Sequence, residues 1–256
     1  MLQINNLSKA FRGKQVLRDI RFSVAPGEIV GLIGMSGSGK STIAKCMLGL
    51  EKPTEGEILW NGRSLLTWNQ KSSWRQAIQI VFQDPRASLN PRWTIQRSLA
   101  EPLINFNMAS DKRSKWQPKE LDTRVQQLLL EVGLDERFMQ RYPDELSTGQ
   151  CQRVCIARAL APGPKLIVLD EPLSALDVTI QAQMLVLLKE LHATQQVSYL
   201  FISHDIAVVS ELCERVLVID KGIIVEDNTA QGLIYDTKHA YTRKLLADTP
   251  SYPNFD

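Results

Sequence analysis

The sequence predicts an α/β fold: a parallel sheet flanked by helices, with an antiparallel β subdomain near the N-terminus and an inserted helical subdomain. Short apolar runs typical of buried strands alternate with segments of helical spacing along most of the chain. One such run, EIVGLIG, leads through a glycine-rich loop into a helical stretch. The alternation stops after residue 83, where a long amphipathic stretch follows, and it resumes near residue 161.

The first part of the chain contains the runs that define the predicted sheets. Two apolar-rich segments near the N-terminus flank a polar stretch from Ser8 to Gln15, which we expect to connect two strands. The stretch STIAKCMLGL has helical spacing and stops near Gly49. We predict strands at Leu2 to Leu7, Ile20 to Val24, Glu28 to Gly34 and Ile78 to Phe82.

The middle of the chain differs in composition and in hydrophobic pattern. From Asp84 to about Glu145 it is rich in proline, tryptophan and amphipathic stretches such as LDTRVQQLLLEVGL, which predicts a mostly helical insertion. Within it, NMASDKRSKWQPKE is basic and punctuated by proline, which favours an exposed loop over a binding patch. We place the helical subdomain at residues 84–160, between core segments 1–83 and 161–227.

The α/β pattern then returns. We predict a buried strand from Leu166 to Asp170, a helix from Ile180 to His192 and a strand from Tyr199 to Ser203. Two further strand-like runs flank Asp220-Lys221-Gly222 and predict a hairpin. The remainder, residues 228–256, is predicted as a short polar tail, with its docking on its own core, on a second chain or on nothing left open.

Composition limits the class of protein. The chain has 256 residues, 44% hydrophobic and 23% charged, and a net charge of +2, so its overall charge does not suggest nucleic acid as a partner. No apolar run reaches the roughly twenty residues that span a bilayer. The cysteines, at positions 46, 151, 155 and 213, form no CxxC pair, which favours a reduced cytoplasmic setting. Cys151 and Cys155 share a helix face, and we favour packing over a metal or redox role for them.

The glycine-rich loop predicts a phosphate site. Residues 34–41, GMSGSGKS, satisfy the pattern Gly-x-x-x-x-Gly-Lys-Ser. Glycines allow successive backbone N–H groups to point inward at phosphate oxygens, and the following helix adds its positive end. We expect Lys40 to reach the terminal phosphates and the Ser41 hydroxyl to bind Mg²⁺. This pattern indicates a nucleotide without indicating its use.

A second acidic motif follows the predicted strand LIVLD. Asp170, at the strand end, is suited to hold Mg²⁺, and Glu171 is suited to polarise a water for attack on a γ-phosphate. An acidic pair after a strand is also consistent with a solvated loop. Its combination with the phosphate loop favours the functional interpretation.

Between these motifs, Leu146-Ser147-Thr148-Gly149-Gln150 opens a predicted helix, and here the chain resembles the ATP-binding-cassette (ABC) transporter ATPases. Four more elements resemble the family's motifs in the family's order. Gln83 corresponds to the Q-loop glutamine, Ser174-Ala175-Leu176-Asp177 to the D-loop and His204 to the switch histidine, while Phe11 resembles the adenine-stacking aromatic. Taken singly, Gln83 and His204 are also consistent with structural roles, and Phe11 with a core position.

The resemblance implies the site residues and their cofactors, ATP and Mg²⁺. Catalytic roles would belong to Glu171, His204 and Gln83, and Mg²⁺ ligation to Ser41, Gln83 and Asp170. The sequence departs from the commonest family pattern at Thr148, where glycine is usual, which leaves open how tightly the signature closes. The residues implied to bind ATP are Phe11, Gly34, Ser36, Gly37, Ser38, Gly39, Lys40, Ser41, Thr42, Asp170, Ser147, Gly149 and Gln150.

The resemblance also implies partners. In this family the signature of one ATPase chain contacts ATP on the phosphate loop of another, so we expect a second ATPase chain, identical or related. FQDPRASLNPR and HAYTRKLL look like stretches in the ATPases of peptide and nickel importers. That implies two membrane-spanning permease subunits, an external solute-binding protein that acts indirectly, and a peripheral position on the cytoplasmic face of a bacterial inner membrane.

Two alternatives remain open, one about the transported cargo and one about the class of ATPase. The sequence has no cysteine after Cys213, which tilts the expected cargo slightly from peptides toward nickel or another metal chelate. The competing class is a soluble ABC ATPase that acts on nucleic acid in repair or translation. A single cassette without sustained heptads or a strongly basic face disfavours that class.

Overall fold

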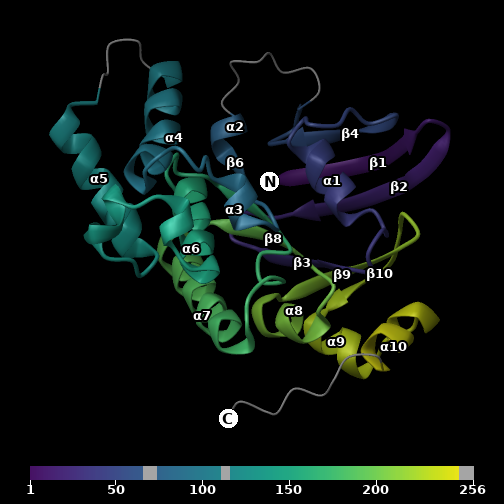
Figure 1. The fold of residues 1–256 in the computed structure, drawn as a ribbon. Helices are drawn as coiled ribbons and strands as arrows, with labels where there is room; N and C mark the ends of the chain where they lie inside the picture. Colours follow the sequence, from purple (N-terminus) through teal and green to yellow (C-terminus); the bar gives the residue numbers. More distant parts are fainter. Residues whose placement is uncertain (66–73, 111–115, 248–256) are drawn as a thin grey trace. The chain divides into compact units, whose positions relative to one another are not determined.

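The computed structural model describes residues 1–65, 74–110 and 116–247 (Figure 1). The chain divides into two compact units. Unit 1 comprises Met1–Gln70, Val168–Glu171 and Ser198–Asp256, and unit 2 comprises Lys71–Ile167 and Pro172–Val197. Both units combine strands and helices, as the predicted α/β class requires. Because the units differ from the segments 84–160 and 161–227 proposed above, those subdomain boundaries stay a prediction.

Unit 1 contains an antiparallel sheet in the order β2-β1-β4-β5. The predicted strands at its start are longer than expected, because β1 and β2 continue through the polar stretch to a two-residue turn at Arg12 and Gly13. Both turn residues have positive φ, 47° and 81°, as a tight hairpin requires. The strands are β1 (Leu2–Phe11), β2 (Lys14–Val24), β4 (Glu55–Trp60) and β5 (Arg63–Ser64).

The second sheet of unit 1 supports the candidate site. Its strand order is β10-β9-β3-β8, followed by the part of β7 that belongs to this unit, and β3 runs parallel to both β8 and β9. All residues of β3 and β8 are buried, which explains their continuous apolar sequences. The strands are β3 (Ile29–Ile33), β7 (Leu166–Asp170), β8 (Ser198–Ser203), β9 (Arg215–Asp220) and β10 (Ile223–Thr229).

The hairpin predicted around residues 220–222 is confirmed, since β9 and β10 pair antiparallel with Ile223 opposite Asp220. The described part of the tail, by contrast, is more ordered than a short polar segment. It forms two helices that pack in unit 1 (yellow in Figure 1). The helices of this unit are α1 (Lys40–Met47), α8 (Ile206–Leu212), α9 (Ala230–Tyr235) and α10 (Ala240–Ala247).

Unit 2 is mostly helical, as predicted for the stretch after Asp84. Its strand β6 (Ile78–Val81) precedes that stretch. Residues 111–115, in the middle of the basic proline-containing segment, lie outside the described residues. The α-helices are α2 (Trp74–Ala77), α3 (Pro85–Ser88), α4 (Ile95–Ser110), α5 (Pro118–Glu131), α6 (Thr148–Leu160) and α7 (Val178–Gln195), with 3₁₀ turns η1 (Glu136–Gln140) and η2 (Pro143–Glu145).

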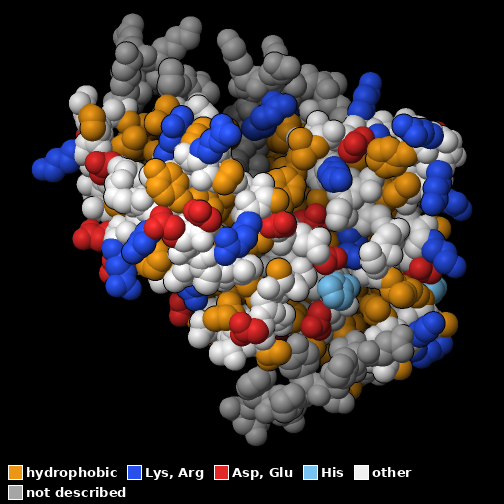
Figure 2. Space-filling model, in the orientation of Figure 1, with side chains coloured by type: hydrophobic (Ala, Val, Ile, Leu, Met, Phe, Trp, Pro, Cys, Tyr) orange, Lys and Arg blue, Asp and Glu red, His pale blue; other side chains and the backbone are white. Residues whose placement is uncertain are grey.

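Two further observations concern the surface and the helices of the described residues. On the face shown in Figure 2, basic and acidic side chains are interspersed over the described residues. In the same described ranges, no helix is both long and apolar enough to cross a bilayer.

The cysteines are all buried and unpaired. The thiols of Cys151 and Cys155 donate to the carbonyls of Pro143 and Pro85, at 3.3 and 3.5 Å. No group of three or more metal-ligating side chains occurs among the residues that the structure describes. The burial of both thiols and their contacts with backbone carbonyls fit the packing role favoured for the Cys151–Cys155 pair.

Candidate functional site

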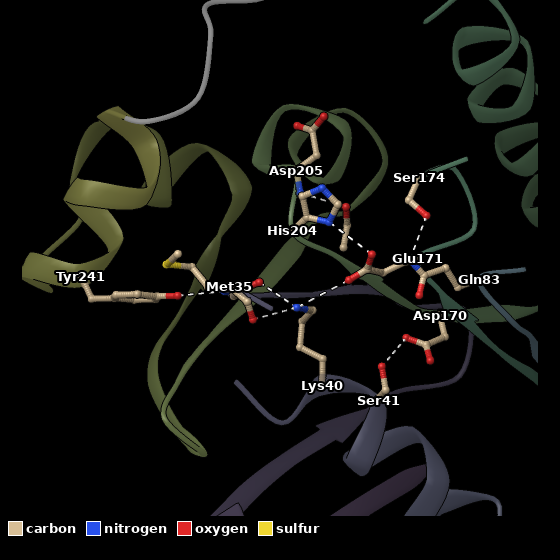
Figure 3. A network of polar contacts seen from close by, with 12 residues as sticks. Met35, Lys40, Ser41, Gln83, Asp170, Glu171, Ser174, His204, Asp205 and Tyr241 are labelled. Carbon is tan, nitrogen blue, oxygen red and sulfur yellow. Dashed lines mark hydrogen bonds and ion pairs between the residues drawn. The ribbon is translucent and has the colours of Figure 1, made fainter. Parts of the chain in front are cut away.

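The carboxyl ends of three strands position most of the predicted catalytic residues, and two of these strands, β3 and β8, pair in parallel. Strand β3 leads into the phosphate loop, β7 ends at Asp170, and β8 ends next to His204. Because these strands are neighbours in the sheet, their ends lie at one edge, where ligands of open α/β sheets bind. Figure 3 shows the resulting network of polar contacts.

The phosphate loop has the backbone conformation that its glycines predict. Gly37 and Gly39 have positive φ, 80° and 115°, and Gly39 directly precedes helix α1. A side chain at Gly39 would be strained, and its Cβ would lie 2.6 Å from a methyl group of Leu17. Ser38 is buried, Ser36 is exposed, and Thr42 lies in the first turn of the helix.

Lys40 lies inside the loop and links it to the acidic motif. Its buried ammonium donates to the carbonyl oxygens of Gly34 and Met35, at 2.7 and 3.1 Å, and lies 3.7 Å from Glu171 Oε1. Burial lowers the pKa of Lys40, while the nearby carboxylates of Glu171 and Asp170 act in the opposite direction. The loop therefore holds a cation at the position where the motif predicts one.

Ser41 and Asp170 form the predicted oxygen pair. The Ser41 hydroxyl donates to Asp170 Oδ1 at 3.1 Å. Burial raises the pKa of Asp170, and the hydrogen bond from Ser41 opposes that shift. Two hard oxygen donors so close together match the ligand preference of Mg²⁺. The donor set therefore fits the predicted metal.

Glu171 lies between Lys40 and His204. Its second carboxylate oxygen is 3.3 Å from Nδ1 of His204, whose side chain is 58% exposed. The backbone of Glu171 has a φ of 49°, and its N–H donates to the carbonyl of Ile202 at 3.0 Å. Left-handed backbone at a non-glycine residue is uncommon and is concentrated at functional sites. The structure thus brings together Lys40, Glu171 and His204, three of the predicted site residues.

Gln83 and the signature residues belong to unit 2. Gln83 Nε2 lies 3.4 Å from the hydroxyl of Ser174, so the predicted Q-loop and D-loop residues are hydrogen-bonded to each other. A ligand role for Gln83 toward Mg²⁺ stays a prediction.

The signature residues begin helix α6 as predicted. Ser147 is the N-cap: its hydroxyl accepts from the N–H of Gln150 at 3.2 Å, and Gln150 Oε1 accepts from the N–H of Ser147 at 2.9 Å. This capping box forms with Thr148 as the first helical residue. Threonine in place of the family's usual glycine is therefore compatible with the start of the helix. Gly149 leaves no room for a side chain, since a Cβ there would lie 2.9 Å from Ile180 Cγ2.

Phe11 lies where β1 meets the turn, as the sequence indicates, and 39% of it is exposed. The ammonium of Lys9 is 4.5 Å from the centre of its ring. An exposed ring at a hairpin is available for stacking, and adenine binding by Phe11 stays a prediction. Sequence reasoning missed a different aromatic: the hydroxyl of Tyr241, on α10, accepts from the N–H of Met35 in the phosphate loop at 2.9 Å.

Comparison with known proteins adds a family assignment. A family model described as ABC transporter matches residues 17–174. The oligopeptide transport ATP-binding protein OppF of Haemophilus influenzae is 41% identical over 98% of this chain and 78% of its own length. OppF of Escherichia coli is 46% identical over 88% of this chain and 66% of its own length. AppF of Bacillus subtilis, another oligopeptide transport ATP-binding protein, is 44% identical over 90% of this chain and 69% of its own length.

Solved structures show the same fold. The ATP-binding cassette MJ0796, in a dimeric post-hydrolysis state bound to ADP and Pi, is similar with a TM-score of 0.79 and 31% identity, over 90% of this chain and 99% of that chain. The structure of cbiO1 from Clostridium perfringens, part of the ABC transporter complex cbiONQ, has the same TM-score and 27% identity, over 92% and 90% of the two chains. Matching motifs, family model and fold lead to one conclusion: the chain belongs to the ABC transporter family and is an ABC ATPase.

Proposed function

We propose that this chain is the ATP-hydrolysing subunit of a bacterial importer whose cargo is peptides. The observation that carries the proposal is the convergence of Lys40, Ser41, Asp170, Glu171 and His204 at the ends of β3, β7 and β8. The relatives named above support the peptide cargo, because they are oligopeptide transport proteins. Their names give no specific support to the nickel alternative, and none of them supports an ATPase that acts on nucleic acid.

In this proposal the phosphate loop binds the triphosphate. Backbone N–H groups of the loop donate to the phosphate oxygens, and the ammonium of Lys40 offsets the charge of the β- and γ-phosphates. Ser41 and Asp170 hold Mg²⁺, with Gln83 as a further proposed ligand, and the ion supplies charge neutralisation on the phosphate oxygens when it is bound. Phe11 supports the adenine ring by stacking.

Glu171 is the proposed general base. Its carboxylate accepts a proton from the attacking water, and His204, 3.3 Å away, orients that carboxylate and the γ-phosphate. The contact between Glu171 and the loop lysine keeps the carboxylate next to the phosphate-binding residues. General base catalysis contributes about 10² to 10⁴ in rate, which sets the size of the effect to test.

The signature residues Ser147, Gly149 and Gln150 are proposed to contact ATP bound to a second ATPase chain. Such contacts exist only while the γ-phosphate is present, so ATP would favour closure of the pair and hydrolysis would release it. Dimeric MJ0796 supports this arrangement. The other proposed partners are two permease subunits and, indirectly, an external solute-binding protein, with the chain peripheral on the cytoplasmic face of the membrane.

The substitution Glu171→Gln tests the proposal. It removes the base but keeps the size of the side chain, so ATP turnover should fall by about 10²-fold or more while ATP still binds. Turnover is measured by phosphate release and binding by calorimetry. Glu190→Gln, on the exposed side of α7, is the matched control and should leave both unchanged. Near-normal turnover in Glu171→Gln would remove Glu171 from its proposed role, and absence of ATP binding by the unmodified chain would overturn the proposed function.

A further inference from the structure

The C-terminal helix α10 contacts the phosphate loop through one hydrogen bond. The N–H of Met35 donates to the hydroxyl of Tyr241 at 2.9 Å, although the two residues are 206 positions apart in the chain. Figure 3 shows the tyrosine reaching from α10 toward the loop. The motif assignments above give Tyr241 no role.

Met35 connects that contact to the phosphate-binding lysine. Its carbonyl oxygen accepts from the ammonium of Lys40 at 3.1 Å and from the N–H of Ser38 at 3.2 Å. Both backbone polar groups of Met35 are therefore engaged, one with α10 and the other inside the loop. A shift of Met35 would move an acceptor that orients Lys40.

The position of Tyr241 is set by its surroundings. Glu226, on β10, accepts from the hydroxyl of Thr237 at 2.8 Å and from the N–H of Lys238 at 3.2 Å, just before the helix begins. The N–H of Tyr241 donates to Nδ1 of His239 at 3.2 Å, and the next residue, Thr242, is fully buried. The tail thus anchors α10 on both sides of the tyrosine.

The electrostatics of Glu226 agree with this anchoring. Burial raises the pKa of Glu226, but the net pKa is lowered, because the carboxylate accepts hydrogen bonds that include those from the Thr237 hydroxyl and the Lys238 N–H. The carboxylate is therefore ionised at neutral pH, when charge-assisted hydrogen bonds to the tail are strongest.

We propose that Tyr241 is a positioning residue for ATP binding: its hydroxyl holds the N–H of Met35 and thereby keeps the phosphate loop and Lys40 in the phosphate-binding arrangement. The tyrosine acts through Met35 and does not itself touch the nucleotide. The inference rests on the proposed function, because it assigns the loop to ATP. If the proposal holds, the position of helix α10 sets the affinity of the phosphate loop for ATP.

Tyr241→Phe removes only the hydroxyl. Loss of one neutral hydrogen bond should raise KM and Kd for ATP by about 3- to 10-fold. Since the catalytic groups are untouched, kcat at saturating ATP should stay within about twofold. Tyr235→Phe is the control, because that tyrosine is also in the C-terminal region but is 86% exposed, and it should change neither constant. Steady-state turnover and calorimetric titration with Mg²⁺ and ATP give the two readouts.

A double-mutant cycle tests whether Tyr241 acts through Met35. Met35→Pro removes the donor N–H, so adding Tyr241→Phe to it should weaken ATP binding no further. If the two substitutions weaken ATP binding additively, Tyr241 does not act through Met35 and the proposal is overturned. An unchanged Kd for ATP in Tyr241→Phe would also overturn it. If Met35→Pro does not fold, the comparison of Tyr241→Phe with Tyr235→Phe decides the matter alone. An unmodified chain that binds no ATP would instead contradict the proposed function, so the two failures are distinguishable.

Discussion

At Glu171, an unusual backbone conformation coincides with a proposed catalytic role. Its left-handed φ of 49° costs about 1 kcal/mol or more in a residue with a side chain. The hydrogen bond from its N–H to Ile202 holds this conformation, and the carboxylate then lies within reach of both Lys40 and His204. The strain is thus maintained by the sheet and directs the side chain that we propose as the base.

The four thiols allow a pH prediction at the residue scale. Burial raises the pKa of Cys46 to about 11 and that of Cys155 to about 12, and it also raises the pKa of Cys151 and Cys213. Because the thiolate is the reactive form, the folded protein should react little with a thiol reagent between pH 7 and 9. Absorbance during titration with such a reagent measures this, and unfolding in guanidinium should expose all four. Rapid modification of Cys151 or Cys155 in the folded state would revive a redox role.

At the scale of the element, the N-cap residue of helix α6 combines an observed structural role with a proposed functional one. Ser147 caps the helix through Gln150, and it is also the proposed contact for a nucleotide on a second chain. A cap contributes about 1 kcal/mol to stability, which is small beside the effect expected for a lost γ-phosphate contact. The two tasks can therefore be separated by experiment.

Three substitutions make that separation. Ser147→Ala should lower the free energy of unfolding by about 1 kcal/mol and reduce ATP turnover by at least about tenfold. Asp135→Ala removes the cap of η1, where Asp135 accepts from the N–H of Arg137, and should cost similar stability without loss of turnover. Ser147→Asp retains a capping oxygen but adds a negative charge, so stability should be kept while turnover is lost. Equal turnover in Ser147→Ala and Asp135→Ala would contradict the nucleotide role.

At the scale of the whole molecule, the predicted site residues are divided between the two units. Unit 1 contains the phosphate loop, the acidic pair and His204, whereas unit 2 contains Gln83 and the signature at the start of α6. The proposed cycle adds a second ATPase chain, whose signature completes the contacts to ATP. Association of chains should then depend on the γ-phosphate.

The Glu171→Gln variant tests this dependence. With Mg²⁺ and ATP it should accumulate as a two-chain complex, because closure is favoured and hydrolysis is slow, whereas ADP should leave single chains. Analytical ultracentrifugation measures the mass, with Glu190→Gln as the control that hydrolyses ATP and should not accumulate. Two combinations are to be measured, namely two copies of this chain and this chain with a related ATPase chain. Single chains in both would contradict the proposed cycle.

Several elements were predictable because their signals are local. The apolar run LIVLD and its acidic end match β7 residue for residue, and the start of α6 follows from the Ser147–Gln150 capping pattern. The hairpin of β4 and β5 was missed, although Asn61-Gly62 has the positive φ values of a tight turn and is itself a strong hairpin signal. The tail helices were missed because a short segment with mixed polarity becomes helical through packing and caps such as Thr229.

The sequence by itself determined the family and predicted the residues of the site, because glycine spacing, strand ends and a capping box depend on neighbouring residues. Only the tertiary structure showed that Glu171 contacts both Lys40 and His204, and that Tyr241 holds Met35. Those pairs are separated by 33 to 206 positions, and nothing in a local pattern specifies which distant side chains meet. Strand order and the anchoring of α10 by Glu226 decide these contacts, since they fix where each backbone segment lies in space.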